Sequence, residues 1–189
     1  MKALKILVAE DESLIRLGLR NMLLKLGHTV VLAADGREAI KQLHLASPDL
    51  ALLDIHMPFT DGLEVARTIA RKRPLPIIIL TAFGEQDLIE RAALLPIHGY
   101  LIKPVNERDL AAAIEIAVAR FEDAQASARE IAELKDSLEA RKVVERAKGI
   151  LMQRGLSEDE AYHTIRRRAR EARVSMRQAA ESIIAPTKN

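Results

Sequence analysis

The chain has 189 residues, no cysteine and a formal net charge of +2, which excludes a disulfide framework and a thiolate metal site. About half of its residues are apolar, enough for one domain of ordinary size and a small second module. No apolar run is long enough to span a membrane, and residues 1–10 lack the apolar core of a signal peptide, so we expect a soluble, cytoplasmic protein without membrane contact.

Short apolar segments alternate with amphipathic segments over the first part of the chain. Each apolar segment precedes a stretch in which apolar residues recur at helical spacing. The predicted strands are residues 4–9, 29–33, 50–53, 76–80 and 99–102. The predicted helices are residues 14–26, 36–45, 63–71 and 85–94, with a further helix that begins near residue 106.

The predicted strands are continuous apolar runs. Such runs indicate strands that are buried on both faces, and therefore a parallel sheet that is covered by helices. Five β-α units in about 120 residues favour a doubly wound, flavodoxin-like α/β fold with strand order 2-1-3-4-5. In such a sheet, functional groups gather at the carboxyl ends of the strands.

A single long helix is predicted from residue 106 to about residue 154, because this stretch has no proline and only one glycine. Near its middle, Ile131, Leu134 and Leu138 have the a/d spacing of a short coiled coil. We expect Gly155 to end the helix. The sequence thus predicts an α/β domain at 1–121, followed by a helical linker with a short coiled coil at 122–140.

Residues 141–189 are predicted to form a small all-α module of three helices. Ser157 and Glu160 form a capping box that starts the second helix, and Ser175 starts the third, which Pro186 ends. The predicted core of the module consists of Val143, Val144, Ala147, Ile150, Leu151, Ala161, Ile165, Ala169, Ala179, Ile183 and Ile184.

Polar side chains follow four of the predicted strands. Glu10 and Asp11 follow the first, Asp54 the third, Thr81 the fourth and Lys103 the fifth. At one edge of a parallel sheet they would form a carboxylate cluster facing a hydroxyl and an ammonium group. Mg²⁺ relieves repulsion between carboxylates, and a carboxylate is a competent nucleophile for phosphoryl transfer. The alternative is that these side chains only cap strands and helices. A capping role explains any one of the positions, but not polar residues at four strand ends in this order.

Four short motifs carry these residues. They are Glu10-Asp11-Glu12, Asp54-Ile55-His56-Met57-Pro58 with Gly62, Thr81-Ala82, and Lys103-Pro104. Together they resemble the receiver domain of two-component signalling, over about residues 5–121. The resemblance implies phosphorylation by a sensor histidine kinase. It implies no catalysis beyond the chain's own phosphorylation and dephosphorylation, so we do not expect an enzyme.

The resemblance also assigns roles to the acidic positions. Asp54 matches the phosphoacceptor, Asp11 the main acid that binds Mg²⁺, and Glu10 its neighbour. The backbone carbonyl of His56 matches the third protein ligand of the metal. The family often has aspartate where this chain has Glu10, so we expect the longer side chain to reach the metal through water. The ring of His56 is an alternative ligand, although we favour an exposed loop side chain.

The remaining roles concern the switch. Thr81 matches the switch hydroxyl and Lys103 the invariant lysine of the family, and we expect both to bind phosphoryl oxygens. Tyr100, three residues earlier, matches the aromatic switch, although an aromatic at a strand edge often serves packing alone. The family usually has a cis bond at Lys103-Pro104. We expect Thr81 to move toward the phosphoryl group and Tyr100 to fill the vacated space.

The C-terminal part of the chain differs from the rest in charge. Residues 141–189 contain 12 basic and 6 acidic side chains, a net charge of +6, whereas residues 1–140 carry a net charge of −4. A basic surface of this kind suits a nucleic-acid partner, but it also suits a solvated helix face.

Two motifs lie in this basic part. They are Ala147-Lys148-Gly149 with Met152, and Glu160-Ala161-Tyr162. Together they resemble the ANTAR domain, the RNA-binding output module of the AmiR and NasT transcription antiterminators, over about residues 134–184. The resemblance implies binding of paired RNA stem-loops and a homodimer that forms on phosphorylation. The candidate RNA-binding residues are Arg141, Lys142, Arg146, Lys148, Tyr162, Arg166, Arg167 and Arg170.

Two other functions remain open at this stage. Three helices after a receiver often form a DNA-binding helix-turn-helix, which would make the chain a DNA-binding response regulator. The third function is protein–protein contact alone, with the helical seam joining two copies and no nucleic acid bound. Charge reversal in the arginine run separates these readings, because it should abolish nucleic-acid binding but leave dimerisation intact.

Overall fold

The computed structural model describes residues 3–82 and 95–185 of the chain. The chain divides after Gln125 into two compact units. The first unit holds a five-stranded, fully parallel sheet of order β2-β1-β3-β4-β5, which confirms the flavodoxin-like prediction. Its strands are β1 (Lys5–Ala9), β2 (Thr29–Ala33), β3 (Leu50–Asp54), β4 (Ile77–Thr81) and β5 (Gly99–Ile102).

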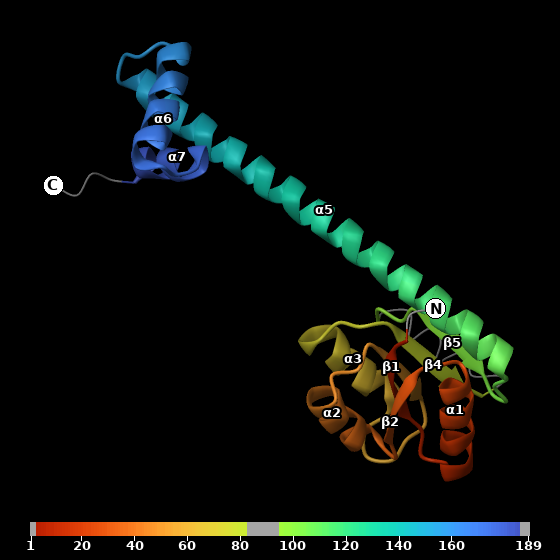
Figure 1. The fold of residues 1–189 in the computed structure, drawn as a ribbon. Coiled ribbons are helices and arrows are strands. Elements are labelled where there is room, and N and C mark those ends of the chain that lie inside the picture. Colours follow the sequence, from red (N-terminus) through yellow and green to blue (C-terminus); the bar gives the residue numbers. More distant parts are fainter. Residues whose placement is uncertain (1–2, 83–94, 186–189) are drawn as a thin grey trace. The chain divides into compact units, whose positions relative to one another are not determined.

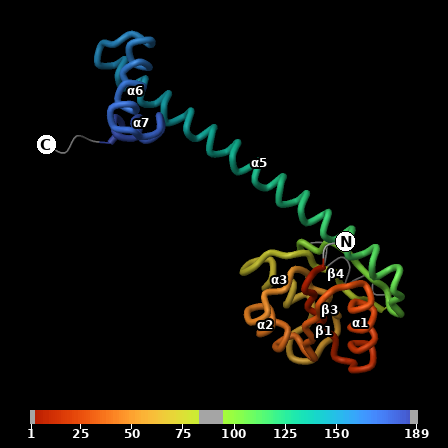
Figure 2. The backbone as a smooth tube through the Cα atoms, in the orientation of Figure 1, coloured from red at the N-terminus to blue at the C-terminus, as the bar shows by residue number. Residues whose placement is uncertain are grey.

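Helices alternate with these strands along the chain (Figures 1 and 2). They are α1 (Ser13–Lys25), α2 (Gly36–Leu45), α3 (Gly62–Lys72) and α5 (Glu107–Gln153). The helix predicted over residues 85–94 lies outside the described residues. None of the described helices is both long enough and apolar enough to cross a membrane.

Each inner strand supplies two hydrophobic cores, because successive side chains point to opposite faces of the sheet. On β3, Ala51 and Leu53 pack in the cluster that includes residues of α2 and α3. Leu50 and Leu52 pack in the cluster that includes residues of α1 and the start of α5. Burial on both faces explains why the strands are continuous apolar runs and have no polar side at which a ligand could bind.

The chain turns tightly where it leaves the carboxyl ends of β2 and β3. A Cβ atom on Gly62 would overlap the backbone carbonyl of Asp54, and one on Gly36 would overlap the carbonyl of Thr60. The amide of Gly62 also donates a hydrogen bond to the carbonyl of Ile55 at 3.0 Å. These approaches hold the loop after Asp54 against the start of α3 and fix the exit direction of the chain.

The second unit contains the C-terminal part of α5 together with α6 (Glu158–Ala172) and α7 (Met176–Ile184). Both predicted helix starts are confirmed, with a capping box from Ser157 to Glu160 and another from Ser175 to Gln178. All predicted core residues belong to a single hydrophobic cluster, which Ala180, Leu156 and Met176 also join. Gly155, with φ of +95°, follows the end of α5 as expected.

Candidate functional site

Three carboxylates converge at the carboxyl ends of β1 and β3. Asp54 is the last residue of β3 and is only 5% exposed, and Glu10 follows β1 and is 1% exposed. Asp11 is exposed beside them. One oxygen from each of the three side chains lies within 4.8 Å of the others. The positions predicted from the strand ends are therefore brought together.

Lys103 joins this cluster from the end of β5. Its Nζ lies 2.8 Å from Oε2 of Glu10 and 2.9 Å from Oδ1 of Asp54. The backbone amide of Lys103 donates to the carbonyl of Thr81 at 2.9 Å, and its peptide bond with Pro104 is cis, as the resemblance implies. One ammonium group is thus shared by two buried carboxylates.

The site carries more negative than positive charge. Burial raises the pKa of Asp54 and the pKa of Glu10, and the hydrogen bonds from Lys103 only partly offset this. Burial alone would lower the pKa of Lys103, but its hydrogen bonds to both carboxylates raise it overall. Three carboxylates facing one ammonium group have the composition that a divalent cation would balance.

The predicted switch residues lie on the two strands beyond Asp54. Thr81 ends β4 and is buried, and its hydroxyl donates to the carbonyl of Ala82 at 3.2 Å. Tyr100 lies on β5 opposite Ile79 and is partly exposed. His56 is exposed in the loop after β3, as favoured for its ring.

The candidate RNA-binding residues fall into two electrostatic groups. Lys148 is nearly buried, and its Nζ lies 3.1 Å from Oε1 of Glu145 and 2.7 Å from Oε1 of Glu158. Lys142 pairs with Glu139 at 2.7 Å. The two lysines thus have acidic partners within their own unit, and Lys148 joins α5 to the first turn of α6.

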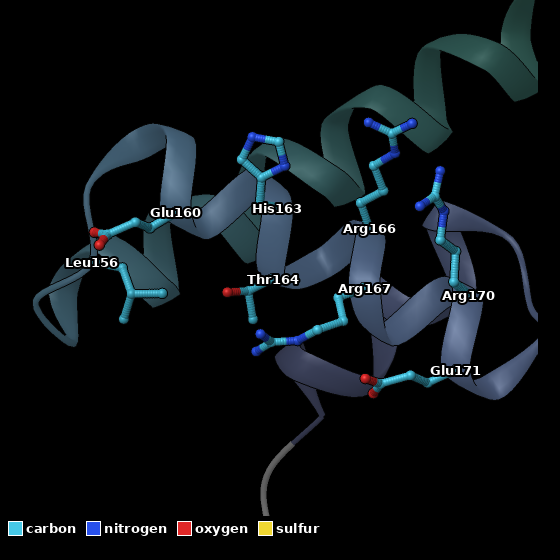
Figure 3. A pocket seen from close by; sticks show the side chains of 8 residues that line it. All are labelled: Leu156, Glu160, His163, Thr164, Arg166, Arg167, Arg170 and Glu171. Atoms are coloured by element: carbon cyan, nitrogen blue, oxygen red, sulfur yellow. The ribbon is translucent and has the colours of Figure 1, made fainter.

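The charges of the candidate arginines are not balanced by acidic partners in this way. Within residues 3–82 and 95–185, no ion pair is formed by Arg141, Arg146, Arg166, Arg167 or Arg170, and all five are exposed. Three of them come from α6 and line a shallow, open cavity of about 730 Å³ together with His163. Figure 3 shows Arg166 and Arg170 projecting to the same side as His163, while Arg167 projects to another side with Thr164 and Glu171. The outer surface of α6 is therefore a cationic face.

Arg177 is a residue that the sequence reasoning missed. Its guanidinium lies 2.6 Å from Oδ1 of Asp136 and 3.0 Å from Oε1 of Glu181, so it ties α7 to α5. Ser175 was correctly predicted as the start of α7. The sequence pattern around Ser175 gave no sign that Arg177 has a partner 41 residues earlier in the chain.

Comparisons with known proteins agree with this arrangement. Residues 6–115 match the family described as response regulator receiver domain, and residues 132–184 match the ANTAR domain. The chain belongs to the ANTAR response regulators. The transcriptional regulatory protein PdtaR of Mycobacterium tuberculosis is 44% identical to this response regulator over 95% of the chain and 89% of its own length.

Solved structures resemble its receiver domain. A receiver domain of a modulated diguanylate cyclase from Desulfovibrio desulfuricans is 33% identical with a TM-score of 0.60, covering 64% of this response regulator and 98% of that chain. A receiver domain from Clostridium thermocellum is 33% identical with a TM-score of 0.58, covering 62% and 96% of the two chains. The first unit therefore has the receiver fold.

Proposed function

We propose that a sensor histidine kinase phosphorylates this response regulator on Asp54, and that its ANTAR domain then binds RNA stem-loops to regulate transcription by antitermination. The observation that carries the first part is the position of Asp54. It is a buried carboxylate at the end of a central strand, 2.9 Å from an ammonium group and beside two further carboxylates. On this proposal the protein acts as a switch and not as an enzyme on another substrate.

Glu10, Asp11, Asp54 and the backbone carbonyl of His56 are the groups that we propose to hold Mg²⁺. The proximity of the three carboxylate oxygens and the excess of negative charge support this assignment. When bound, Mg²⁺ would neutralise phosphoryl oxygens and so lower the repulsion that an incoming phosphoryl group meets.

The chain's own residues supply the rest of the transfer step. A carboxylate oxygen of Asp54 forms a bond to phosphorus while the bond from phosphorus to the kinase's histidine nitrogen breaks. Lys103 is already within hydrogen-bond distance of Asp54, so its ammonium can donate to a phosphoryl oxygen at the same edge.

The switch then operates through β4 and β5. We propose that the hydroxyl of Thr81 exchanges the carbonyl of Ala82 for a phosphoryl oxygen, and that Tyr100 moves into the space that Thr81 leaves. The backbone amide of Lys103 donates a hydrogen bond to the carbonyl of Thr81. This bond joins the ends of β4 and β5 and supports the proposed coupling between them.

The exposed cationic face of α6 supports RNA as the ligand of the output domain. Arg166, Arg167 and Arg170 are exposed and form no ion pair with the described residues, so their guanidinium groups are available for phosphate contacts and for stacking on unpaired bases. Lys148, by contrast, is assigned to holding α6 against α5, because Glu145 and Glu158 already neutralise it.

A homodimer is proposed to bring two output domains to paired stem-loops. Ile131, Leu134 and Leu138 are between 52% and 59% exposed along one side of α5, which supports burial against a second copy. Joining two weak RNA sites makes the second contact intramolecular and raises the overall affinity.

The experiment compares binding to a paired stem-loop RNA and to a matched duplex DNA, with and without a small-molecule phosphodonor and Mg²⁺. Wild-type protein should prefer the RNA and bind it more tightly when phosphorylated, while Asp54→Asn should not respond to the phosphodonor. Preference for DNA would replace the proposal with a DNA-binding regulator. If the wild-type protein binds neither RNA nor DNA but still dimerises, a role in protein–protein contact would be favoured.

A further inference from the structure

The loop between β3 and α3 begins and ends beside Asp54. Residues 55–61 form this loop, and Gly62 at its end lies so close to Asp54 that an added Cβ would overlap the carbonyl of Asp54. Gly36 of α2 holds another part of the loop, because its own Cβ would overlap the carbonyl of Thr60. The loop is therefore fixed in position next to the candidate phosphoacceptor.

Phe59 has an unusual backbone conformation in this loop. Its φ is +68°, a left-handed value that bulky side chains rarely adopt. The amide of Thr60 donates a hydrogen bond to the carbonyl of Pro58 at 2.9 Å, so the bond closes around Phe59. A hydrogen bond between residues i and i+2 around a positive φ is the pattern of the rarer, strained form of the γ-turn. Backbone strain of this kind is concentrated at binding sites and switches.

The turn displays the ring of Phe59 to solvent. The side chain is 72% exposed, and the guanidinium carbon of Arg37 lies 4.6 Å from the ring centroid, within the range of a cation–π contact. Arg37 is itself exposed and forms no ion pair with any residue in the described ranges. The two side chains thus form a small surface with an apolar part and a cation that has no acidic partner.

A second exposed apolar side chain lies at the same edge of the sheet. Leu14, in the first turn of α1, is 77% exposed and comes four residues after Glu10. Leu14 and Phe59 are the two most exposed large apolar side chains in the described part of the chain, and both lie in segments that leave the carboxyl ends of strands. Leu45 is 69% exposed but ends α2 shortly before β3 begins, so it lies at the opposite edge.

The position of Asp54 argues for the kind of partner that covers this edge. Asp54 is only 5% exposed, so a phosphohistidine can reach its carboxylate only if the protein that carries the histidine covers the surrounding surface. A small-molecule phosphodonor has no such requirement. A symmetric contact between two copies of the edge would instead bring two clusters of three carboxylates together, and like charges facing one another oppose association.

We propose that Phe59 and Arg37 form a contact site for the histidine-bearing domain of the sensor kinase, and that Phe59 determines which kinase is accepted. The surface fits an apolar side chain with a carboxylate next to it, since the first packs on the ring and the second pairs with Arg37. The inference rests on the proposed phosphorylation of Asp54 and goes further by naming residues that bind the donor. Phe59 is a positioning residue, because it takes no part in making or breaking the bonds to phosphorus.

The test uses the full chain and two kinds of phosphodonor. The protein donors are the sensor histidine kinases of the same organism, purified and autophosphorylated with radiolabelled ATP, and the one that transfers fastest to the wild type is kept. Phosphoramidate is the small-molecule donor. Phe59→Asn should raise the KM for transfer from the kinase roughly tenfold with little change in kcat, because asparagine tolerates a positive φ but lacks the ring. Phosphoramidate should label this variant and the wild type at the same rate.

Three further variants serve as controls. Phe59→Tyr should retain the wild-type KM because it keeps the ring, and Arg37→Gln should raise KM because it removes the cation. Leu45→Asn removes an apolar side chain of similar exposure at the opposite edge and should leave KM unchanged. Thermal unfolding shows whether each variant folds, and Phe59→Asn should unfold at or above the wild-type temperature because it relieves strain in the turn.

The outcomes distinguish this contact from the proposed function. A higher KM for Phe59→Asn with normal labelling by phosphoramidate would support the contact. Equal KM values for the wild type and a folded Phe59→Asn would overturn it and leave phosphorylation of Asp54 standing. Slower labelling of Phe59→Asn by both donors would also overturn it, because the loop would then act on the chemistry of Asp54. If the wild type accepts phosphate from none of the kinases, both proposals fail.

Discussion

The ammonium of Lys103 lies 2.9 Å from Oδ1 of Asp54, although Asp54 ends β3, Lys103 follows β5, and β4 lies between these strands in the sheet. The same ammonium reaches Glu10 at the end of β1. A single side chain therefore connects the ends of three strands, and adding or removing charge at any of them alters the other contacts.

Mg²⁺ should stabilise the wild-type receiver domain by relieving the repulsion among its carboxylates. A ligand that binds only the folded state raises the unfolding temperature as its concentration rises. We expect a concentration-dependent increase for the wild type and a much smaller one for Asp54→Asn, which removes one charge. Differential scanning calorimetry with increasing MgCl₂ measures this, with NaCl at equal ionic strength as the control. Equal increases in both proteins would contradict the metal assignment.

Gly62→Ala should destabilise the receiver domain by about 1–3 kcal/mol, because its Cβ would overlap the carbonyl of Asp54. Gly18→Ala is the matched control, since no atom lies within 4 Å of its added Cβ. Within helix α1 this control should raise the free energy of unfolding by roughly 0.5–1 kcal/mol. Urea unfolding monitored by circular dichroism gives both values. The close approach would be refuted by a Gly62→Ala protein as stable as the wild type.

Two buried histidines should make stability depend on pH. Nδ1 of His98 accepts from the amide of Ile77 at 3.1 Å, and Nδ1 of His28 accepts from the amide of Leu4 at 3.2 Å. A protonated imidazole cannot accept, and burial lowers the pKa of both rings in the folded state. The contribution of the two histidines to the free energy of unfolding is therefore complete above the unfolded pKa of about 6.5. It is lost as pH falls from there through the lower pKa of the folded state.

His98→Asn tests this dependence, because the asparagine oxygen can accept from Ile77 without titrating. Between pH 7.5 and pH 5.5 the variant should lose less stability than the wild type in urea unfolding. His44→Asn, which makes the same substitution at an exposed histidine of α2, is the matched control. Parallel profiles for the wild type and His98→Asn would rule out the predicted role of His98.

Variants of Lys148 and Arg166 should distinguish a charge that stabilises the output domain from a charge that binds RNA. Lys148→Met removes the contacts with Glu145 and Glu158, so the unfolding temperature of the output domain should fall, while Lys148→Arg should largely retain it. Arg166→Gln should leave the unfolding temperature unchanged and reduce the slope of log Kd against log salt by about 1 for RNA. Filter binding from 50 to 300 mM KCl measures the slope. An unchanged slope would exclude Arg166 from phosphate contact.

The sequence predicted the sheet because burial on both faces leaves a clear signal. The apolar runs of β3 and β4 and the polar residues Asp54 and Thr81 at their ends were sufficient to place the edge of the site. The capping box at Ser157 likewise identified the start of α6, because its hydrogen bonds are local.

Contacts between distant side chains could not be predicted in the same way. The basic pattern around Lys148 gave no indication that the loop before α6 brings Glu158 within 2.7 Å of its ammonium. The sequence did not predict that Met176 of α7 and Tyr162 of α6 line the same cavity, because periodicity indicates which residues are buried and not which helix they face. Side-chain pairing across turns depends on packing that a single sequence does not encode locally.

The length of Glu10 has a consequence for the order of events at the site. The ammonium group of Lys103 forms one ion pair with the carboxylate of Glu10 and another with that of Asp54, so the two carboxylates compete for it. An aspartate at this position would be one methylene shorter, so the 2.8 Å contact with Lys103 depends on the full length of the Glu10 side chain. On the proposed phosphorylation of Asp54, Lys103 would therefore have to give up a hydrogen bond to one of two carboxylates before it could donate to a phosphoryl oxygen.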